Sequence, residues 1–325
     1  MTLSVSDLSR LLDLGEYRRC LKEAALMLAE GAHDAVGEAR IQAAVCRSYL
    51  ELTDHQAAIG AGLKAAVLAR RAGAHDVLGT VLLDLGTAYG QVRDHTEALK
   101  CFEQYLERLP NCTSARCLEG AVRRRRADAL LALDNRSAAL EEYRLAARWF
   151  DRYGDEAQVQ ECLHAMIGIH LGQNQPANAI PLLQEQDQRS ANRTQNQDTR
   201  CRYLLDLTRY LLATGRPAEA AAVGFSALEL AEDRLPQQAE AQLLMCRAAL
   251  AQDRRAEALS LALAARVTAI DGRLYELEFE ASQVMFRLLS EQGLALLQEV
   301  EADYRRQGVN IYHYLPEKVL RQEFQ

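Results

Sequence analysis

The sequence predicts an all-α protein, a right-handed superhelical solenoid of seven to eight helical hairpins. Two observations support this fold class: a turn pattern that recurs at nearly constant spacing, and a composition suited to helices. The 325 residues are 49% hydrophobic but only 6% aromatic, and their bulk is Ala, Leu, Arg, Glu and Gln, which favour helices. Runs of alternating β-branched residues, which would indicate strands, are absent from the sequence.

A polar turn, followed three residues later by a small residue, recurs seven times along the chain. The turns span residues 15–17, 53–55, 93–95, 134–136, 174–176, 215–217 and 253–255, and the small residues are Cys20, Ala58, Ala98, Ala139, Ala179, Ala220 and Ala258. Successive small residues lie 38 to 41 positions apart. Such fixed-period similarity is typical of stacked hairpins, so each turn is expected to join two helices. A weaker eighth unit is expected around Gly293 and Ala295.

The third unit carries the pattern in most detail. It reads L-x-x-L-G-x-x-Y, then A-x-x-x-F, then P, and consists of Leu82, Leu85, Gly86, Tyr89, Ala98, Phe102 and Pro110. Gly86 is expected to let the second helix pack closely, Phe102 to close the core between hairpins, and Pro110 to end the second helix. The pattern resembles that of bacterial tetratricopeptide repeat proteins, with Leu82 in place of Trp. This resemblance covers nearly the whole chain.

A repeat array needs no internal domain boundary, so we expect one solenoid over residues 1–308 and a C-terminal cap or tail over 309–325. The polar run 186–198 is expected to be a loop between the fifth and sixth hairpins. The tail is apolar and aromatic, with Ile311, Tyr312 and Leu315 among its residues. We expect it to cover the open end of the last hairpin; the alternative is that it docks on a second copy and forms a homodimer.

Motifs for export, membrane insertion and catalysis are absent from the sequence. Because no signal-peptide pattern and no apolar run of about 18 residues occurs, we expect a cytoplasmic protein with reduced cysteines and no membrane partner. Cys46 and Cys246 occupy the slot of Gly86, and Cys20 that of Ala98, where cysteine acts as a small hydrophobe. Phosphate-loop, zinc and serine-hydrolase motifs are lacking. We therefore expect no enzyme activity, no cofactor and no metal.

The resemblance implies that the first helix of each hairpin lines a concave groove that binds a peptide or a partner's helix. The ligand-facing positions lie about 18, 15 and 11 residues before the small residue. They select Arg40, Ala43, Arg47, Thr80, Leu83, Thr87, Ala121, Arg124 and Asp128 in hairpins two to four, and Glu161, His164, Gly168, Arg202, Leu205, Arg209, Glu240, Leu243 and Arg247 in hairpins five to seven.

Six of these eighteen positions are arginine and three are acidic, a basic excess in a chain that carries a net charge of −7. An arginine side chain can grip a carboxylate with two N–H groups, so the set predicts binding of acidic side chains or a terminal carboxylate. The candidate contacts are Arg40, Arg47, Arg124, Asp128, His164, Arg202, Arg209 and Arg247. The alternative is an ordinary solvated face, in which Arg47 pairs with Glu51 and Arg202 with Asp206.

The sequence therefore predicts a non-enzymatic scaffold for a protein or peptide ligand. Two alternatives stay open. Arrays with about forty residues per unit resemble those of bacterial peptide-pheromone receptors, and also the sensory halves of signalling proteins, which suggests an accessory subunit of a signalling enzyme. Neither a helix-turn-helix ahead of Leu8 nor a catalytic signalling motif after Gly293 is present. A nucleic-acid partner is disfavoured because the chain is acidic and lacks interleaved basic and aromatic residues.

Overall fold

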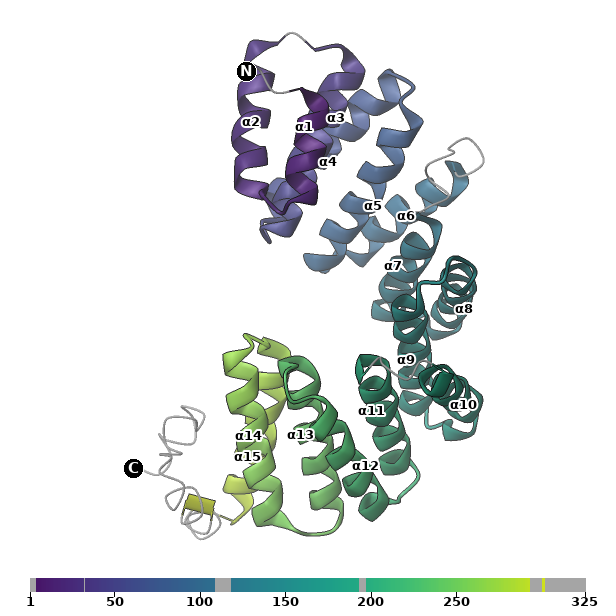
Figure 1. Cartoon of the computed structure of the whole chain (residues 1–325), viewed down its shortest axis with the longest axis vertical. Coiled ribbons are helices and arrows are strands. Elements are labelled where there is room, and N and C mark those ends of the chain that lie inside the picture. Colours follow the sequence, from purple (N-terminus) through teal and green to yellow (C-terminus); the bar gives the residue numbers. More distant parts are fainter. Residues whose placement is uncertain (1–3, 32, 109–117, 193–196, 293–299, 302–325) are drawn as a thin grey trace. The chain divides into compact units, whose positions relative to one another are not determined.

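The computed structural model describes residues 4–31, 33–108, 118–192, 197–292 and 300–301. These residues form fifteen α-helices, and no strand occurs among them (Figure 1). In chain order the helices are α1 Val5–Asp13, α2 Tyr17–Glu30, α3 Ala35–Glu51, α4 His55–Arg71, α5 His75–Gln91, α6 His95–Arg108, α7 Glu119–Ala132, α8 Arg136–Tyr153, α9 Glu156–Gly172, α10 Pro176–Asn192, α11 Gln197–Ala213, α12 Pro217–Leu230, α13 Leu235–Ala251, α14 Arg255–Asp271 and α15 Tyr275–Gln292. The all-α prediction is confirmed.

The helices group into two compact units, Met1–Cys162 and Leu163–Gln325. Consecutive helices pack against each other from α1 to α8 and from α10 to α15, and Ile167 of α9 shares a core cluster with Ala179 of α10. First helices of successive hairpins are also in contact, as α3 is with α5 and α11 with α13. Each unit is therefore a stack of hairpins, as expected for a helical repeat solenoid. The extension of one continuous array over residues 1–308 stays a prediction.

All seven predicted turns join two helices. Each begins with a residue in the left-handed conformation, at φ between 55° and 72°: Gly15, Thr53, Arg93, Asp134, Asn174, Gly215 and Asp253. The N–H of the next residue donates to a carbonyl five residues back, as from Asp54 to Tyr49 and from Asp94 to Tyr89, both at 2.9 Å. This bond satisfies a free carbonyl at the end of the first helix. Glycine occupies this left-handed position in only two of the seven turns. In the other five, the packing of the two helices holds a non-glycine residue in the same conformation.

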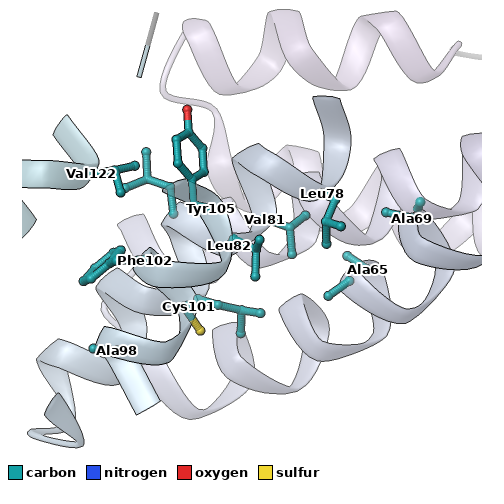
Figure 2. Packing of buried hydrophobic residues seen from close by; sticks show 14 of the residues in the cluster. Ala65, Ala69, Leu78, Val81, Leu82, Ala98, Cys101, Phe102, Tyr105 and Val122 are labelled. Carbon is teal, nitrogen blue, oxygen red and sulfur yellow. The ribbon is translucent and has the colours of Figure 1, made fainter. Parts of the chain in front are cut away.

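The third hairpin packs as its motif predicts (Figure 2). A Cβ on Gly86 would lie 2.3 Å from Cε1 of Phe102, so only glycine admits this close approach of α5 and α6. Ala98 is fully buried, and Phe102 is 1% exposed. Val122 of the next hairpin joins the same cluster, which makes it a core shared between hairpins. Pro110 lies outside the described residues.

The three cysteines assigned to close-packing slots are fully buried, as predicted. The Sγ atom of Cys46 lies 3.0 Å from the place where a Cβ on Gly62 would stand. The thiol of Cys246 donates to the carbonyl of Ala258 at 3.1 Å. Burial raises the pKa of Cys46 and of Cys246 to about 12. Both therefore act as neutral packing groups at helix crossings.

The predicted loop over 186–198 is wrong for most of its length. Helix α10 continues to Asn192, and α11 begins at Gln197. Gln186 is fully buried, and Ser190 is 7% exposed. A polar run is typical of a solvated loop, but two of the side chains in this one face the protein interior. The expected eighth turn at 293–295 and the tail 309–325 lie outside the described residues. No described helix combines the length and apolarity needed to span a bilayer.

Candidate functional site

A continuous groove runs along the first helices of the unit Met1–Cys162. One part, of about 590 Å³, lies between α1, α3 and α5 and includes Arg40. The other part, of about 850 Å³, extends from α3 and α5 to α7 and the end of α8 and includes Arg124. Arg47, Glu51 and Asp84 line both parts, so the two hollows join. We call this surface the groove.

The groove coincides with the positions selected from the repeat pattern. Of the nine positions predicted in hairpins two to four, eight line it: Arg40, Ala43, Arg47, Thr80, Leu83, Thr87, Ala121 and Arg124. The ninth, Asp128, lines a smaller hollow between α5, α6 and α7. Its carboxylate accepts a hydrogen bond from the hydroxyl of Tyr143 at 2.5 Å. Whether these groove residues contact a ligand stays a prediction.

Arg47 is held by a carboxylate of the next hairpin. Its Nη2 lies 2.7 Å from Oδ1 of Asp84, and its Nε donates to Oδ2 at 3.1 Å. The Asp84 side chain is only 3% exposed. Burial raises the pKa of Asp84 to about 6, and the Arg47 charge opposes this rise. The predicted pairing of Arg47 with Glu51 is also present, at a longer 3.8 Å.

Arg40 and Arg124 differ from Arg47 because neither forms an ion pair with any described residue. Arg40 is exposed at the edge of the groove. Arg124 is half-buried, and its Nε is buried without an acceptor. Burial, together with the charge of Arg124, lowers the pKa of the neighbouring Arg125, whose own partner Asp128 lies 3.8 Å away. Arg40 and Arg124 are thus guanidinium groups without an ion-pair partner among the described residues, although carboxylates such as Asp13 and Asp155 line the groove as well.

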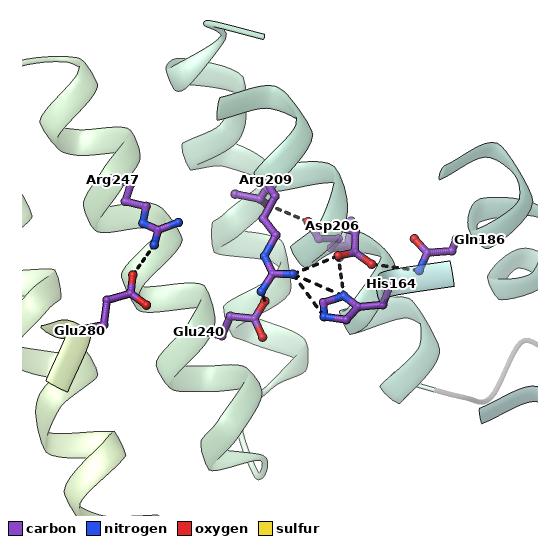
Figure 3. A network of polar contacts seen from close by, with 9 residues as sticks. His164, Gln186, Asp206, Arg209, Glu240, Arg247 and Glu280 are labelled. Atoms are coloured by element: carbon purple, nitrogen blue, oxygen red, sulfur yellow. Dashed lines mark hydrogen bonds and ion pairs between the residues drawn. The ribbon is translucent and has the colours of Figure 1, made fainter. Parts of the chain in front are cut away.

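In the unit Leu163–Gln325, a polar network joins α9, α10, α11 and α13 (Figure 3). The Nδ1 atom of His164 lies 2.7 Å from Oδ1 of Asp206, and the amide of Gln186 donates to Oδ2 at 3.0 Å. Arg209 lies 3.5 Å from Asp206 and 2.8 Å from Glu240. Asp206 is completely buried. Burial favours a raised pKa for Asp206, but the charges of His164 and Arg209 and the two hydrogen bonds outweigh it and lower the pKa.

The remaining predicted arginines of this unit lie on α11 and α13. Arg202 is half-buried on α11. Arg247 forms an ion pair with Glu280 of α15, as Figure 3 shows. The carboxylates that bind Arg47, Arg209 and Arg247 thus each come from the next hairpin. Salt bridges of this kind connect the first helices of successive hairpins. The ion pairs expected from the sequence lay within single helices and did not include them.

Sequence reasoning missed Asp84, and it named Asp206 only as a possible partner of Arg202, not as the buried carboxylate that meets His164, Gln186 and Arg209. Both aspartates stand 14 residues before the small residue of their hairpins, Ala98 and Ala220 respectively. A carboxylate at the same repeat position, on the face that packs against the neighbouring hairpin, was a signal that could have identified both. Trp149 and Tyr153 of α8 also line the groove. The repeat pattern gives no signal for them, because its ligand-facing positions all lie on first helices.

No protein-family model matches the chain, and no curated protein matches it in sequence. Solved structures of similar fold include NprR in complex with its cognate peptide NprX, at 12% identity and a TM-score of 0.56 over 89% of this chain and 88% of that one. They also include a Rap protein complexed with Competence and Sporulation Factor, at 12% identity and a TM-score of 0.50 over 90% and 74%. BtubC from P. vanneervenii has 16% identity and a TM-score of 0.54 over 69% and 91%. The chain therefore has the fold of a bacterial tetratricopeptide repeat protein.

The described residues hold no group of three or more His, Cys, Asp and Glu side chains that could bind a metal ion. What the groove offers instead is a long hollow with guanidinium groups, hydroxyls and apolar side chains along it. Such a surface is suited to binding an extended ligand by charge and shape.

Proposed function

We propose that this protein binds a peptide, or an extended segment of a partner protein, in the groove of its first unit, and that it does so without catalysis. The ligand carries acidic side chains or a free C-terminal carboxylate. The observation that carries the proposal is the pair of guanidinium groups, Arg40 and Arg124, that lie in one continuous groove without ion-pair partners among the described residues.

Charge complementarity favours an acidic ligand over a neutral one. Arg47 already binds Asp84, so the guanidinium groups open to a ligand carboxylate are those of Arg40 and Arg124, and the ligand must place its carboxylates there and away from Asp13 and Asp155. A hydrogen bond to a charged group contributes about 1.5–3 kcal/mol. Each well-placed carboxylate should therefore strengthen binding by at least about tenfold.

A regulatory peptide receptor is the finer form of this proposal. NprR and the Rap protein, which share this fold, were solved with a peptide and with a sporulation factor bound. In the second unit, His164, Arg202, Arg209 and Arg247 remain candidate contacts. Glu240 and Glu280 already bind two of them, so a ligand there would have to displace a carboxylate.

Random-peptide display on the purified full-length chain tests the proposal. Selected peptides should be rich in Asp and Glu or depend on a free C-terminus, and calorimetric titration should show weaker binding as salt rises. Arg40→Gln and Arg124→Gln should each weaken binding about tenfold or more. Arg148→Gln, which removes an exposed charge of α8 outside the groove, should leave the Kd unchanged. Failure to select any peptide, or equal Kd values for all four proteins, would refute the proposal.

A further inference from the structure

An aromatic wall closes the groove where α7 begins and α8 ends. The rings of Trp149 and Tyr153 lie 4.3 Å apart between centroids, tilted by 35°. Trp149 covers Gly120, where a Cβ would approach Cε3 of the indole to 2.5 Å. Phe150, which is buried, meets the indole edge-on at 5.4 Å. Contacts with Gly120 and Phe150 thus hold the indole of Trp149 in place, while Tyr153 remains 61% exposed.

A guanidinium that has no ion-pair partner in the described part of the chain borders the same end of the groove. Arg124 stands one turn after Gly120 on α7 and lines the groove together with both rings. Its buried Nε has no acceptor among the described residues. A buried donor left unpaired costs free energy and therefore calls for a binding partner.

The neighbouring carboxylates do not supply that partner. Asp155 also lines the groove, but it forms no ion pair with Arg124 among the described residues, and its Oδ1 accepts a hydrogen bond from the backbone N–H of Gln158 at 3.2 Å. Asp84 is bound to Arg47. Arg125 adds a second positive charge beside Arg124. A cationic ligand could use the aromatic faces but would leave the guanidinium of Arg124 unpaired, and so would a purely apolar ligand. A ligand with an anionic group next to an apolar side chain would pair with the guanidinium of Arg124 and also pack on the aromatic rings.

We propose that Arg124, Trp149 and Tyr153 form a subsite for an apolar or aromatic residue that adjoins a carboxylate of the bound peptide. The carboxylate binds the guanidinium of Arg124, and the side chain packs on the exposed face of Tyr153 and the adjacent indole. This subsite rests on the proposed function, because it presumes that the groove holds a peptide. A C-terminal carboxylate and an acidic side chain offer Arg124 the same chemistry.

Trp149 is the only tryptophan of the chain, so 5-fluorotryptophan labelling gives a single ¹⁹F resonance that reports this subsite. Three probes separate the carboxylate sources: N-acetyl-Ala-Phe with a free carboxylate, N-acetyl-Ala-Phe amide, and N-acetyl-Glu-Phe amide. The free acid should shift the resonance saturably, and the alanyl amide should bind about tenfold more weakly. A glutamyl amide that matches the free acid would identify an acidic side chain as the preferred source, and one that matches the alanyl amide would identify the C-terminus.

Matched variants test the roles of the side chains. Arg124→Gln should abolish the difference between acid and amide, whereas Arg148→Gln on the exposed face of α8 should preserve it. Tyr153→Ala should weaken the free acid and the amide alike, by about fivefold. Because no described residue accepts from the Nε of Arg124, Arg124→Gln should not lower the melting temperature, which separates a binding role from a structural one.

Equal shifts by the free acid and both amides, or no shift by any probe, would overturn the subsite. The peptides selected by display distinguish this failure from failure of the proposed function. If a selected peptide binds in the calorimeter but leaves the ¹⁹F resonance of Trp149 unmoved, the subsite is wrong and the groove still binds peptides. If no peptide binds at all, both proposals fall.

Discussion

Replacing Asp84 by Asn should stabilise the protein at neutral pH, although it removes one half of a salt bridge. The buried carboxylate of Asp84 has one cationic partner among the described residues, Arg47, whose side chain remains 36% exposed. Burial raises the pKa of Asp84 to about 6, so desolvation outweighs the attraction of the arginine. Asn keeps the shape and an oxygen that accepts from Arg47, but it brings no charge into the interior.

The magnitude follows from the pKa difference between the folded and unfolded states. The ordinary pKa of Asp is about 3.9, and each pKa unit corresponds to about 1.4 kcal/mol, so the raised value corresponds to roughly 3 kcal/mol. Because the folded state holds the proton more tightly, this stability is full below the unfolded pKa and is lost as the pH rises to about 6. At pH 7 the ionised carboxylate thus destabilises the fold, and Asp84→Asn should recover about 1–3 kcal/mol.

Thermal unfolding followed by circular dichroism at pH 4 and pH 7 provides the assay. The melting temperature of Asp84→Asn should exceed that of the parent at pH 7 by about 2–4 °C per kcal/mol and should match it near pH 4. Asp206→Asn is the matched control at the same repeat position. Its pKa is lowered, so Asp206 contributes stability above the unfolded pKa that is lost on acidification, and its replacement should destabilise at pH 7. A lower melting temperature for Asp84→Asn at pH 7 would refute the reasoning.

Three further changes test the groove and the packing. Carboxylate peptides should bind more tightly as the pH falls from 7 towards 5, because protonation of Asp84 frees Arg47; titration at both pH values measures this, and an unchanged Kd contradicts it. Thr53→Gly should raise stability by about 0.5–1 kcal/mol, because Thr53 adopts φ 62°, which glycine adopts without strain. A lower denaturation midpoint would show that the contacts of the threonine side chain outweigh this strain. Cys46→Leu should cost about 1–3 kcal/mol by overpacking, and Cys46→Ala less; an unchanged midpoint for Cys46→Leu would mean that the slot is not tight.

The fold could be predicted from the sequence because the turns repeat. A small residue three positions after each turn fixes where two helices cross, and the seven hairpins follow from that spacing alone. The polar run at 186–198 was predicted wrongly for a physical reason. Gln186 is buried because its amide donates to Asp206, so its polarity serves an interior carboxylate and does not indicate solvent. Polarity alone does not distinguish a solvated side chain from a satisfied buried one.

The position of the groove could also be predicted, but its charge balance could not. The repeat pattern places Arg40, Arg47 and Arg124 on the first helices, and all three line the groove. Which of them is neutralised depends on residues about one hairpin further along, such as Asp84, and pairing within one helix gives no information about those. Trp149 lies on a second helix and reaches the groove only because α8 ends beside the start of α7, a proximity that requires the folded hairpin.

Asp84 and Asp206 occupy equivalent positions of their hairpins, yet their carboxylates have different surroundings. Both carboxylates are buried at the same position of their hairpins. Asp206 is met by His164, Gln186 and Arg209 and has a lowered pKa, whereas Asp84 depends on Arg47 and has a raised one. The number of partners from neighbouring helices therefore decides the charge state. Because Asp84 also lines the groove, its protonation between pH 7 and pH 5 links the stability of the first unit to the charge available for a ligand.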